Sequence, residues 1–254
     1  MPDIKLNKEE KIRYIRHFNV PEIGENGQIK LKKASVLIVG AGGLGSASSL
    51  YLTAAGIGKI GLVDSDNVDL SNLQRQIVHA MNSMGKPKVD SARDRLMGIN
   101  PSVKICGIHE RLIPETINEI LADYSIVIDA TDNFETRYLL NEACVRLRKP
   151  LVYGAVYQFY GQMCVFDATE GPCFRCIFRE IPTEEVINAN RGVGVVSPVP
   201  GVIGTLQAIE TIKLILNIGT PSIGRLLLFD GLQMQFQEIS VRKDPACPVC
   251  GKRK

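Results

Sequence analysis

A glycine-rich stretch near the start of the sequence has the residue types of a phosphate-binding turn. Gly40, Gly42 and Gly45 come at the end of the apolar run VLIV and satisfy the pattern G-x-G-x-x-G, with Gly43 as a fourth glycine. Glycine lets the backbone turn tightly and approach a phosphate without a Cβ in the way. The N–H groups at the start of the next helix then face the anion. The pattern predicts nucleotide binding; the alternative is a turn that only allows a helix and a sheet to pack.

An acidic residue and a polar loop distinguish between two kinds of nucleotide. Asp64 ends the next apolar run, where a carboxylate can bind ribose hydroxyls. Asn72 and Arg75 follow in the segment SDNVDLSNLQRQ, and Lys88 lies at a predicted helix start. An NAD-binding enzyme has no obvious need for an arginine-bearing loop here, because the glycine turn already binds the pyrophosphate. ATP carries roughly four negative charges, which arginine and lysine can bind. We therefore interpret Asn72, Arg75 and Lys88 as residues that bind a triphosphate.

A third polar group lies in the segment SIVIDATDNFETR. Asp129 ends an apolar run, and Asp132 and Asn133 follow in the next loop. Ligands of open α/β sheets bind beyond the carboxyl ends of the strands, so Asp129 and Asp132 could both face the nucleotide. Asp132 could instead cap a helix near Glu135. It could also bind Mg²⁺, which takes one or two carboxylates plus substrate phosphates.

Four of the seven cysteines form two C-x-x-C pairs. They lie in GPCFRC (171–176) and PACPVCGK (245–252), with 70 residues between the pairs. Four thiolates in two tight turns are typical of a structural zinc site, which would hold the C-terminal tail against the body of the protein. A redox role for one pair is the weaker alternative. The proposed zinc ligands are Cys173, Cys176, Cys247 and Cys250.

The elements that must position these residues alternate between apolar runs and helical stretches. This alternation predicts a Rossmann-like, doubly wound α/β fold with a mostly parallel sheet whose strands are buried on both faces. Later, partly antiparallel strands would extend the sheet. The predicted strands are 36–40, 59–64, 103–108, 125–130, 150–156, 161–168, 225–231 and 234–241, and the predicted helices are 44–55, 88–97, 115–122, 135–147 and 202–218.

The sequence also suggests a division of the chain. Residues 1–33 read as an N-terminal arm, with a short helix over Lys8–His17 followed by a loop, and residues 34–254 as one domain. Within that domain we expect a nucleotide-binding half (34–150) and a second half (151–254). The second half contains a loop at about 180–200, whose length is more often functional than structural.

Composition and the lengths of the apolar stretches argue against several classes of protein. The 254 residues carry a net charge of only +3, which gives little support to nucleic-acid binding. We find no signal-peptide pattern and no stretch near the roughly 20 apolar residues that a membrane span needs. Seven cysteines are an odd number, and in a chain without a recognised export signal this argues against a disulfide framework. We therefore expect a cytoplasmic protein.

The motifs GAGGLG, DNVDLSNLQRQ, GKPKVDSARDRL and DATDN occur in this order. In this respect the chain resembles the ubiquitin-activating-type adenylyltransferases of bacteria, the MoeB, ThiF and HesA group, over about Arg13 to Gly251. The resemblance implies adenylation of the C-terminal Gly-Gly of a small ubiquitin-like sulfur-carrier protein. This reaction uses ATP and Mg²⁺ and serves sulfur transfer in molybdopterin, thiamine or related biosynthesis.

The resemblance also implies roles for individual residues. Asp132 would be the essential magnesium-binding acid, and Arg16, in the stretch RYIRH, would reach the ATP of the other subunit of a homodimer. His17 stands where the family usually has glutamine. Asn190 stands where some members have a cysteine that joins the carrier covalently, which leaves such a step in doubt. The ATP site would comprise Gly40, Gly42, Gly43, Gly45, Asp64, Ser71, Asn72, Leu73, Gln74, Arg75, Lys88, Asp132 and Asn133, with Arg16, Arg75, Lys88 and Asp132 as the catalytic set.

Three other functions remain open at this point. A relative within the family could activate a non-protein carboxylate, such as a modified tRNA base. The glycine pattern is also compatible with an NAD-dependent oxidoreductase. A catalytically silent scaffold could keep the fold, although Arg16, Arg75, Lys88 and Asp132 together argue against it.

Overall fold

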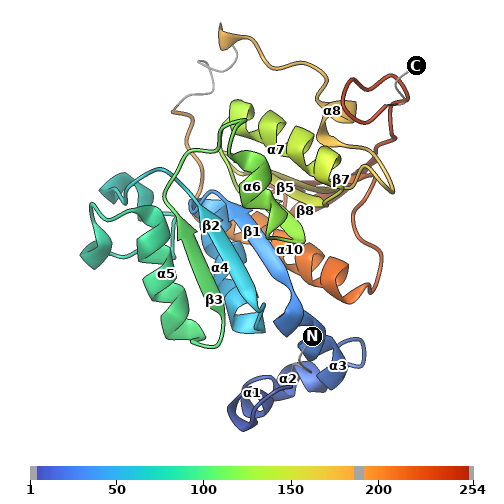
Figure 1. Ribbon diagram of the computed structural model, residues 1–254. Coiled ribbons are helices and arrows are strands. Elements are labelled where there is room, and N and C mark those ends of the chain that lie inside the picture. Colours follow the sequence, from blue (N-terminus) through green and yellow to red (C-terminus); the bar gives the residue numbers. More distant parts are fainter. Residues whose placement is uncertain (1–4, 186–191, 252–254) are drawn as a thin grey trace.

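A single eight-stranded sheet runs through the molecule, with strand order β3-β2-β1-β4-β5-β6-β7-β8. The computed structural model describes residues 5–185 and 192–251 (Figure 1). The strands from β3 to β5 are parallel, and those from β5 to β8 are antiparallel, as predicted. Their bounds are β1 Ser35–Val39, β2 Lys59–Val63, β3 Lys104–Ile108, β4 Ile126–Asp129, β5 Leu151–Tyr157, β6 Tyr160–Phe166, β7 Arg225–Asp230 and β8 Gln235–Ser240.

Helices cover both faces of the sheet (Figure 1). One buried cluster joins α4 (Gly43–Ala55), α5 (Lys88–Ile99) and α10 (Pro198–Leu216) to one face of the central strands. A second cluster joins α6 (Ile117–Ala122), α7 (Phe134–Leu147) and α8 (Phe174–Ile177) to the other face. This two-sided burial confirms the predicted doubly wound α/β fold.

Burial of the strands follows their place in the sheet. All residues of β4 are buried, and in β1 and β2 only the first residue is not. The prediction of burial on both faces is wrong for β3, whose residues are all exposed or half-buried. The reason is position, since β3 is the edge strand and has only β2 beside it. At the other edge, all six residues of β8 are exposed.

The N-terminal segment contains more helix than predicted. The expected helix over residues 8–17 is present as α1 (Lys8–Arg13) and α2 (Ile15–Phe18), but residues 24–33, predicted as a loop, form α3 (Gly24–Lys33). Its Leu31 is fully buried, and the Gln28 amide donates to the carbonyl of Ala55 at the end of α4 (2.8 Å). Packing against the domain therefore outweighs the low helix propensity of glycine in this segment.

The long apolar helix α10 lies against the sheet. It begins at Pro198, four residues before the predicted start, because proline is well tolerated in a first turn. By length and composition it could cross a membrane, so the expectation that no stretch approaches this length is wrong. In this fold α10 packs on α3, α4, β5 and β6, and half of it is buried.

Candidate nucleotide site and cysteine cluster

A cleft of about 1340 Å³ opens at the carboxyl ends of the parallel strands. The strand order reverses between β1 and β4, which is where open α/β sheets bind ligands. Eight of the residues predicted from the sequence line this cleft. They are Gly40, Gly42, Gly43, Asp64, Arg75, Lys88, Asp132 and Asn133.

Two glycines make the turn between β1 and α4 possible. Gly40 has φ 98°, and a Cβ on it would lie 2.5 Å from the carbonyl oxygen of Ala130 after β4. A Cβ on Gly45 would lie 1.9 Å from the carbonyl oxygen of Gly40, so Gly45 allows helix and strand to pack and does not line the cleft. Among the described residues, no side chain caps the first turn of α4. Its N–H groups are therefore free to bind an anion.

Asp64 and Lys88 are held beside this turn. The Asp64 carboxylate accepts from the N–H groups of Ala41 (2.8 Å) and Asp66 (2.9 Å). The Lys88 ammonium group donates to the carboxylate of Asp66 (2.8 Å), and Lys88 is buried while Asp66 is exposed. Asp66 was not among the predicted site residues, although its place two positions after Asp64 would have been a signal. Both residues line the cleft, and the ion pair holds the ammonium group of Lys88 there.

The loop between β2 and α5 presents Arg75 to the cleft. Asp69 and Asn72 cap a short 3-10 helix, η1 (Leu70–Asn72), and the Arg75 guanidinium donates to the carbonyl of Ser71 (3.1 Å). Gln74 accepts from the hydroxyl of Ser197, just before α10 (2.9 Å). Of the five predicted residues 71–75, the structure places only Arg75 among the residues that line the cleft. Ser71, Asn72, Leu73 and Gln74 belong to the loop that carries it.

The prediction that Asp129 faces the nucleotide is wrong. Its side chain is fully buried and accepts from the Nε of Arg137 (3.1 Å) and the hydroxyl of Thr131 (2.6 Å). Arg137 also donates to the Thr131 carbonyl (2.7 Å), directly before Asp132. A carboxylate buried at the end of a central strand needs such a partner, because an unpaired charge is costly away from water.

Asp132 is free for a different role. Asn133, and not Asp132, caps α7, since the Asn133 side chain accepts from the N–H of Thr136 (2.9 Å). Asp132 is exposed, lines the cleft and has no hydrogen bond or ion pair within the described residues. An exposed carboxylate that lines this cleft fits the donor set of Mg²⁺.

Arg137→Met is expected to lower the free energy of unfolding by about 3–5 kcal/mol, because it leaves the Asp129 carboxylate buried without its partner. Urea unfolding measures this loss. Arg111→Met is the control: the Arg111–Glu135 pair is 65% and 78% exposed, so its removal should change stability little. Equal losses in the two variants would contradict the role of burial.

The family resemblance singled out two further residues, Arg16 and Asn190. Arg16 is exposed on α2 and is not among the residues that line the cleft. Asn190 lies outside the described residues, as does the middle of the loop predicted at 180–200. The chain contains three histidines. His17 bonds to Gln28 (2.8 Å), His109 to the Ser65 carbonyl (2.9 Å), and His79 is buried.

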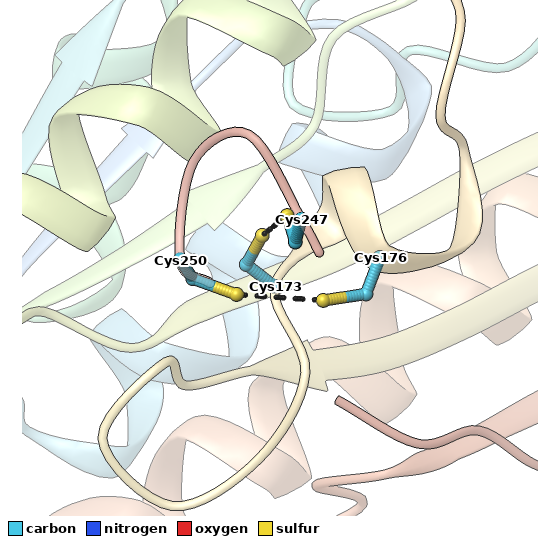
Figure 2. A group of neighbouring side chains, drawn as sticks. All are labelled: Cys173, Cys176, Cys247 and Cys250. Carbon is cyan, nitrogen blue, oxygen red and sulfur yellow. Dashed lines mark hydrogen bonds between the residues drawn. The ribbon is translucent and has the colours of Figure 1, made fainter. Parts of the chain in front are cut away.

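The four cysteines of the C-x-x-C pairs lie together, as Figure 2 shows. The Sγ atoms of Cys173 and Cys247 are 3.6 Å apart, those of Cys176 and Cys250 are 3.4 Å apart, and all four lie within 4.8 Å of one another. A tetrahedral zinc with Zn–S bonds of about 2.3 Å places its sulfurs about 3.8 Å apart. The donor set and spacing therefore fit a zinc ion that joins α8 to the C-terminal tail.

The other three cysteines do not join this cluster. Cys144 and Cys164 are buried and Cys106 is half-buried. Burial raises the pKa of Cys164 to about 12, so this thiol stays protonated at neutral pH. None of them lines the cleft.

Comparison with known proteins assigns the chain to a family. The sequence profile of the ThiF family matches residues 14–249. The chain is 46% identical to the sulfur carrier protein adenylyltransferase of Thermus thermophilus, over 98% of this chain and 93% of that protein. It is 50% identical to the adenylyltransferase and sulfurtransferase MOCS3 of Culex quinquefasciatus, over 97% of this chain but only 56% of that protein. The chain thus spans about half the length of the MOCS3 relatives it matches.

Solved structures give the same fold. The structure of E. coli MccB with ATP has a TM-score of 0.84 at 25% identity and covers 99% of this chain and 76% of that one. The sequence motifs, the cleft at the reversal of strand order and the extent of these matches agree. The chain belongs to the ThiF family.

Proposed function

We propose that this protein uses ATP to adenylate the C-terminal carboxylate of a small ubiquitin-like sulfur-carrier protein that ends in Gly-Gly. The observation that carries the proposal is the cleft itself, where Arg75, Lys88 and Asp132 surround an uncapped helix start after a glycine turn. The relatives support it: the protein of Thermus thermophilus is a sulfur carrier protein adenylyltransferase, and that of Haloferax volcanii is a SAMP-activating enzyme E1.

The reaction needs no general base. A C-terminal carboxyl group has a pKa of about 3.3–3.7 and is ionised at neutral pH. One carboxylate oxygen attacks the α-phosphorus of ATP, a new O–P bond forms, and the bond from that phosphorus to the bridging oxygen breaks. Pyrophosphate leaves with this electron pair, and the carrier becomes an acyl-adenylate. The protein's task is to place two anions in line and to neutralise their charge.

Four side chains would contribute to neutralising this charge. ATP and the carboxylate bring roughly five negative charges, which Arg75, Lys88, Arg16 and a magnesium ion would balance. Asp132 would hold the ion, which supplies charge neutralisation at the phosphates. Lys88 now pairs with Asp66, and a bound triphosphate would compete for this ammonium group.

The remaining partners complete the proposal. Arg16 lies outside the cleft of its own chain, which agrees with a homodimer in which it reaches the ATP of the other subunit. The carrier would contact the half formed by residues 151–254, whose Tyr160, Gln162 and Gln237 line the far part of the cleft. The zinc site would be structural, since four cysteines leave no open coordination position. We place the protein in the cytoplasm.

ATP–pyrophosphate exchange tests this function. We expect exchange with one of the small Gly-Gly-terminated carriers encoded by the same organism, and loss of exchange when the two glycines are removed from that carrier. A single active carrier would also name the pathway. ATP binding without exchange for any carrier would overturn the proposal in favour of a non-protein carboxylate or a scaffold. Hydride transfer would favour the NAD-dependent oxidoreductase.

A further inference from the structure

A buried histidine that does not line the cleft contacts the glycine turn. His79 lies between η1 and α5, is 7% exposed, and uses both ring nitrogens. Its Nε2 lies 2.9 Å from the carbonyl oxygen of Ala41, and its Nδ1 lies 2.9 Å from the hydroxyl of Ser91 on α5. Neither contact belongs to a helix or a strand ladder. They join two segments that both carry predicted phosphate ligands.

The hydrogen-bond partners settle which nitrogen carries the proton. A carbonyl oxygen only accepts, so Nε2 of a neutral ring must donate to Ala41, and Nδ1 accepts from the hydroxyl of Ser91. Burial lowers the pKa of His79, which keeps the ring neutral at neutral pH. The direction of both hydrogen bonds is therefore defined.

The bond to Ala41 fixes the orientation of a peptide unit in the glycine turn. A trans peptide is planar, so the Ala41 carbonyl and the Gly42 N–H point in opposite directions. With the carbonyl directed at His79 behind the turn, the Gly42 N–H is directed away from it, toward the cleft that Gly42 lines. This N–H donates to no other described residue. The N–H of Ala41 is held by Asp64 (2.8 Å), so residue 41 is restrained on both sides.

We propose that His79 is a positioning residue for phosphate binding: it holds the Ala41 carbonyl and thereby directs the Gly42 N–H at the phosphates of ATP. Through Ser91 it also ties the turn to α5, one helical turn after Lys88, so the two phosphate-binding elements keep a fixed separation. This inference rests on the proposed use of ATP. It does not depend on which carboxylate is adenylated.

Two substitutions separate the two contacts of the ring. The amide of glutamine lies near the position of Nε2, and that of asparagine near the position of Nδ1. His79→Asn should therefore lose the Ala41 contact and weaken ATP binding about tenfold, whereas His79→Gln should restore most of the affinity. Adenosine has no phosphate, so its affinity should change less than about twofold in either variant.

Titration calorimetry with ATP and with adenosine, both with Mg²⁺, measures these affinities in the full chain. Equal weakening of ATP and adenosine in His79→Asn would assign a merely structural role, and unchanged ATP binding in the folded variant would also overturn the proposal. If His79→Asn does not fold, Ser91→Ala tests the same link. It should weaken ATP about threefold and leave adenosine unchanged. Failure of the wild type to bind ATP would instead refute the proposed function and this role with it.

Discussion

Asp132→Ala is expected to reduce ATP–pyrophosphate exchange by about a thousandfold or more and to leave the melting temperature unchanged. The loss is large because a metal ion at the phosphates is worth several kcal/mol of transition-state stabilisation, and Asp132 is its proposed ligand. The fold should tolerate the change because Asp132 is exposed and Asn133 provides the cap of α7. Exchange assays across a range of magnesium concentrations measure the effect.

Two further variants sharpen this test. Asp132→Asn keeps an oxygen ligand and loses the charge, so higher magnesium should recover part of its activity. Glu135→Ala removes an exposed carboxylate three residues away, in the first turn of α7, and should leave exchange close to that of the wild type. Near-normal exchange in Asp132→Ala would refute the metal-binding role. Equal losses in Asp132→Ala and Glu135→Ala would point to the general charge of the loop.

Cys247→Ser is expected to release zinc and to lower the melting temperature by roughly 10 °C or more. Structural zinc sites contribute on the order of 10 kcal/mol of binding free energy, and a loss of a few kcal/mol shifts the melting temperature of a chain of this size by about this much. The site joins two segments that are 70 residues apart in the sequence. Without the metal, the C-terminal tail should separate from α8.

Zinc content and thermal unfolding must be measured on the same samples. Cys106→Ala is the matched control, because Cys106 lies on β3 and outside the four-cysteine cluster. It should keep one zinc per chain and nearly the wild-type melting temperature. An unchanged melting temperature after verified loss of zinc would refute the stabilising role. Wild-type protein purified without zinc, with the same stability when zinc is added, would refute the site itself.

Much of the fold was predictable because its parallel strands are short apolar runs that alternate with helical stretches. The observed β1, β2 and β4 differ from their predicted ranges by at most one residue at each end. Such elements are indicated by the pattern of apolar residues within a short window, which can be read directly from the sequence. The two C-x-x-C pairs could also be recognised from the sequence, since the spacing of residues within a tight turn is a local property.

The incorrect predictions concern features that depend on contacts between residues far apart in the sequence. The helix α3 forms because Gln28 and Leu31 find partners on distant elements, and no local propensity reveals those partners. Asp129 looked like a ligand because it ends a strand, but Arg137, eight residues later, neutralises it in the core. The edge position of β3 depends on the order of strands in the sheet, which its own residues do not specify.

The sequence by itself determined the family and the glycine turn, and it predicted a site that contains Asp64, Arg75, Lys88 and Asp132, because motif residues and their spacing are local information. Only the tertiary structure decided which residues meet. It brought Asp132 and Lys88 into one cleft and paired Lys88 with Asp66. It also made Asn133 the cap of α7 and placed His79 within hydrogen-bond distance of the Ala41 carbonyl. Burial and hydrogen bonding between distant segments fix these pairings, because a buried polar group must find a partner wherever the fold supplies one.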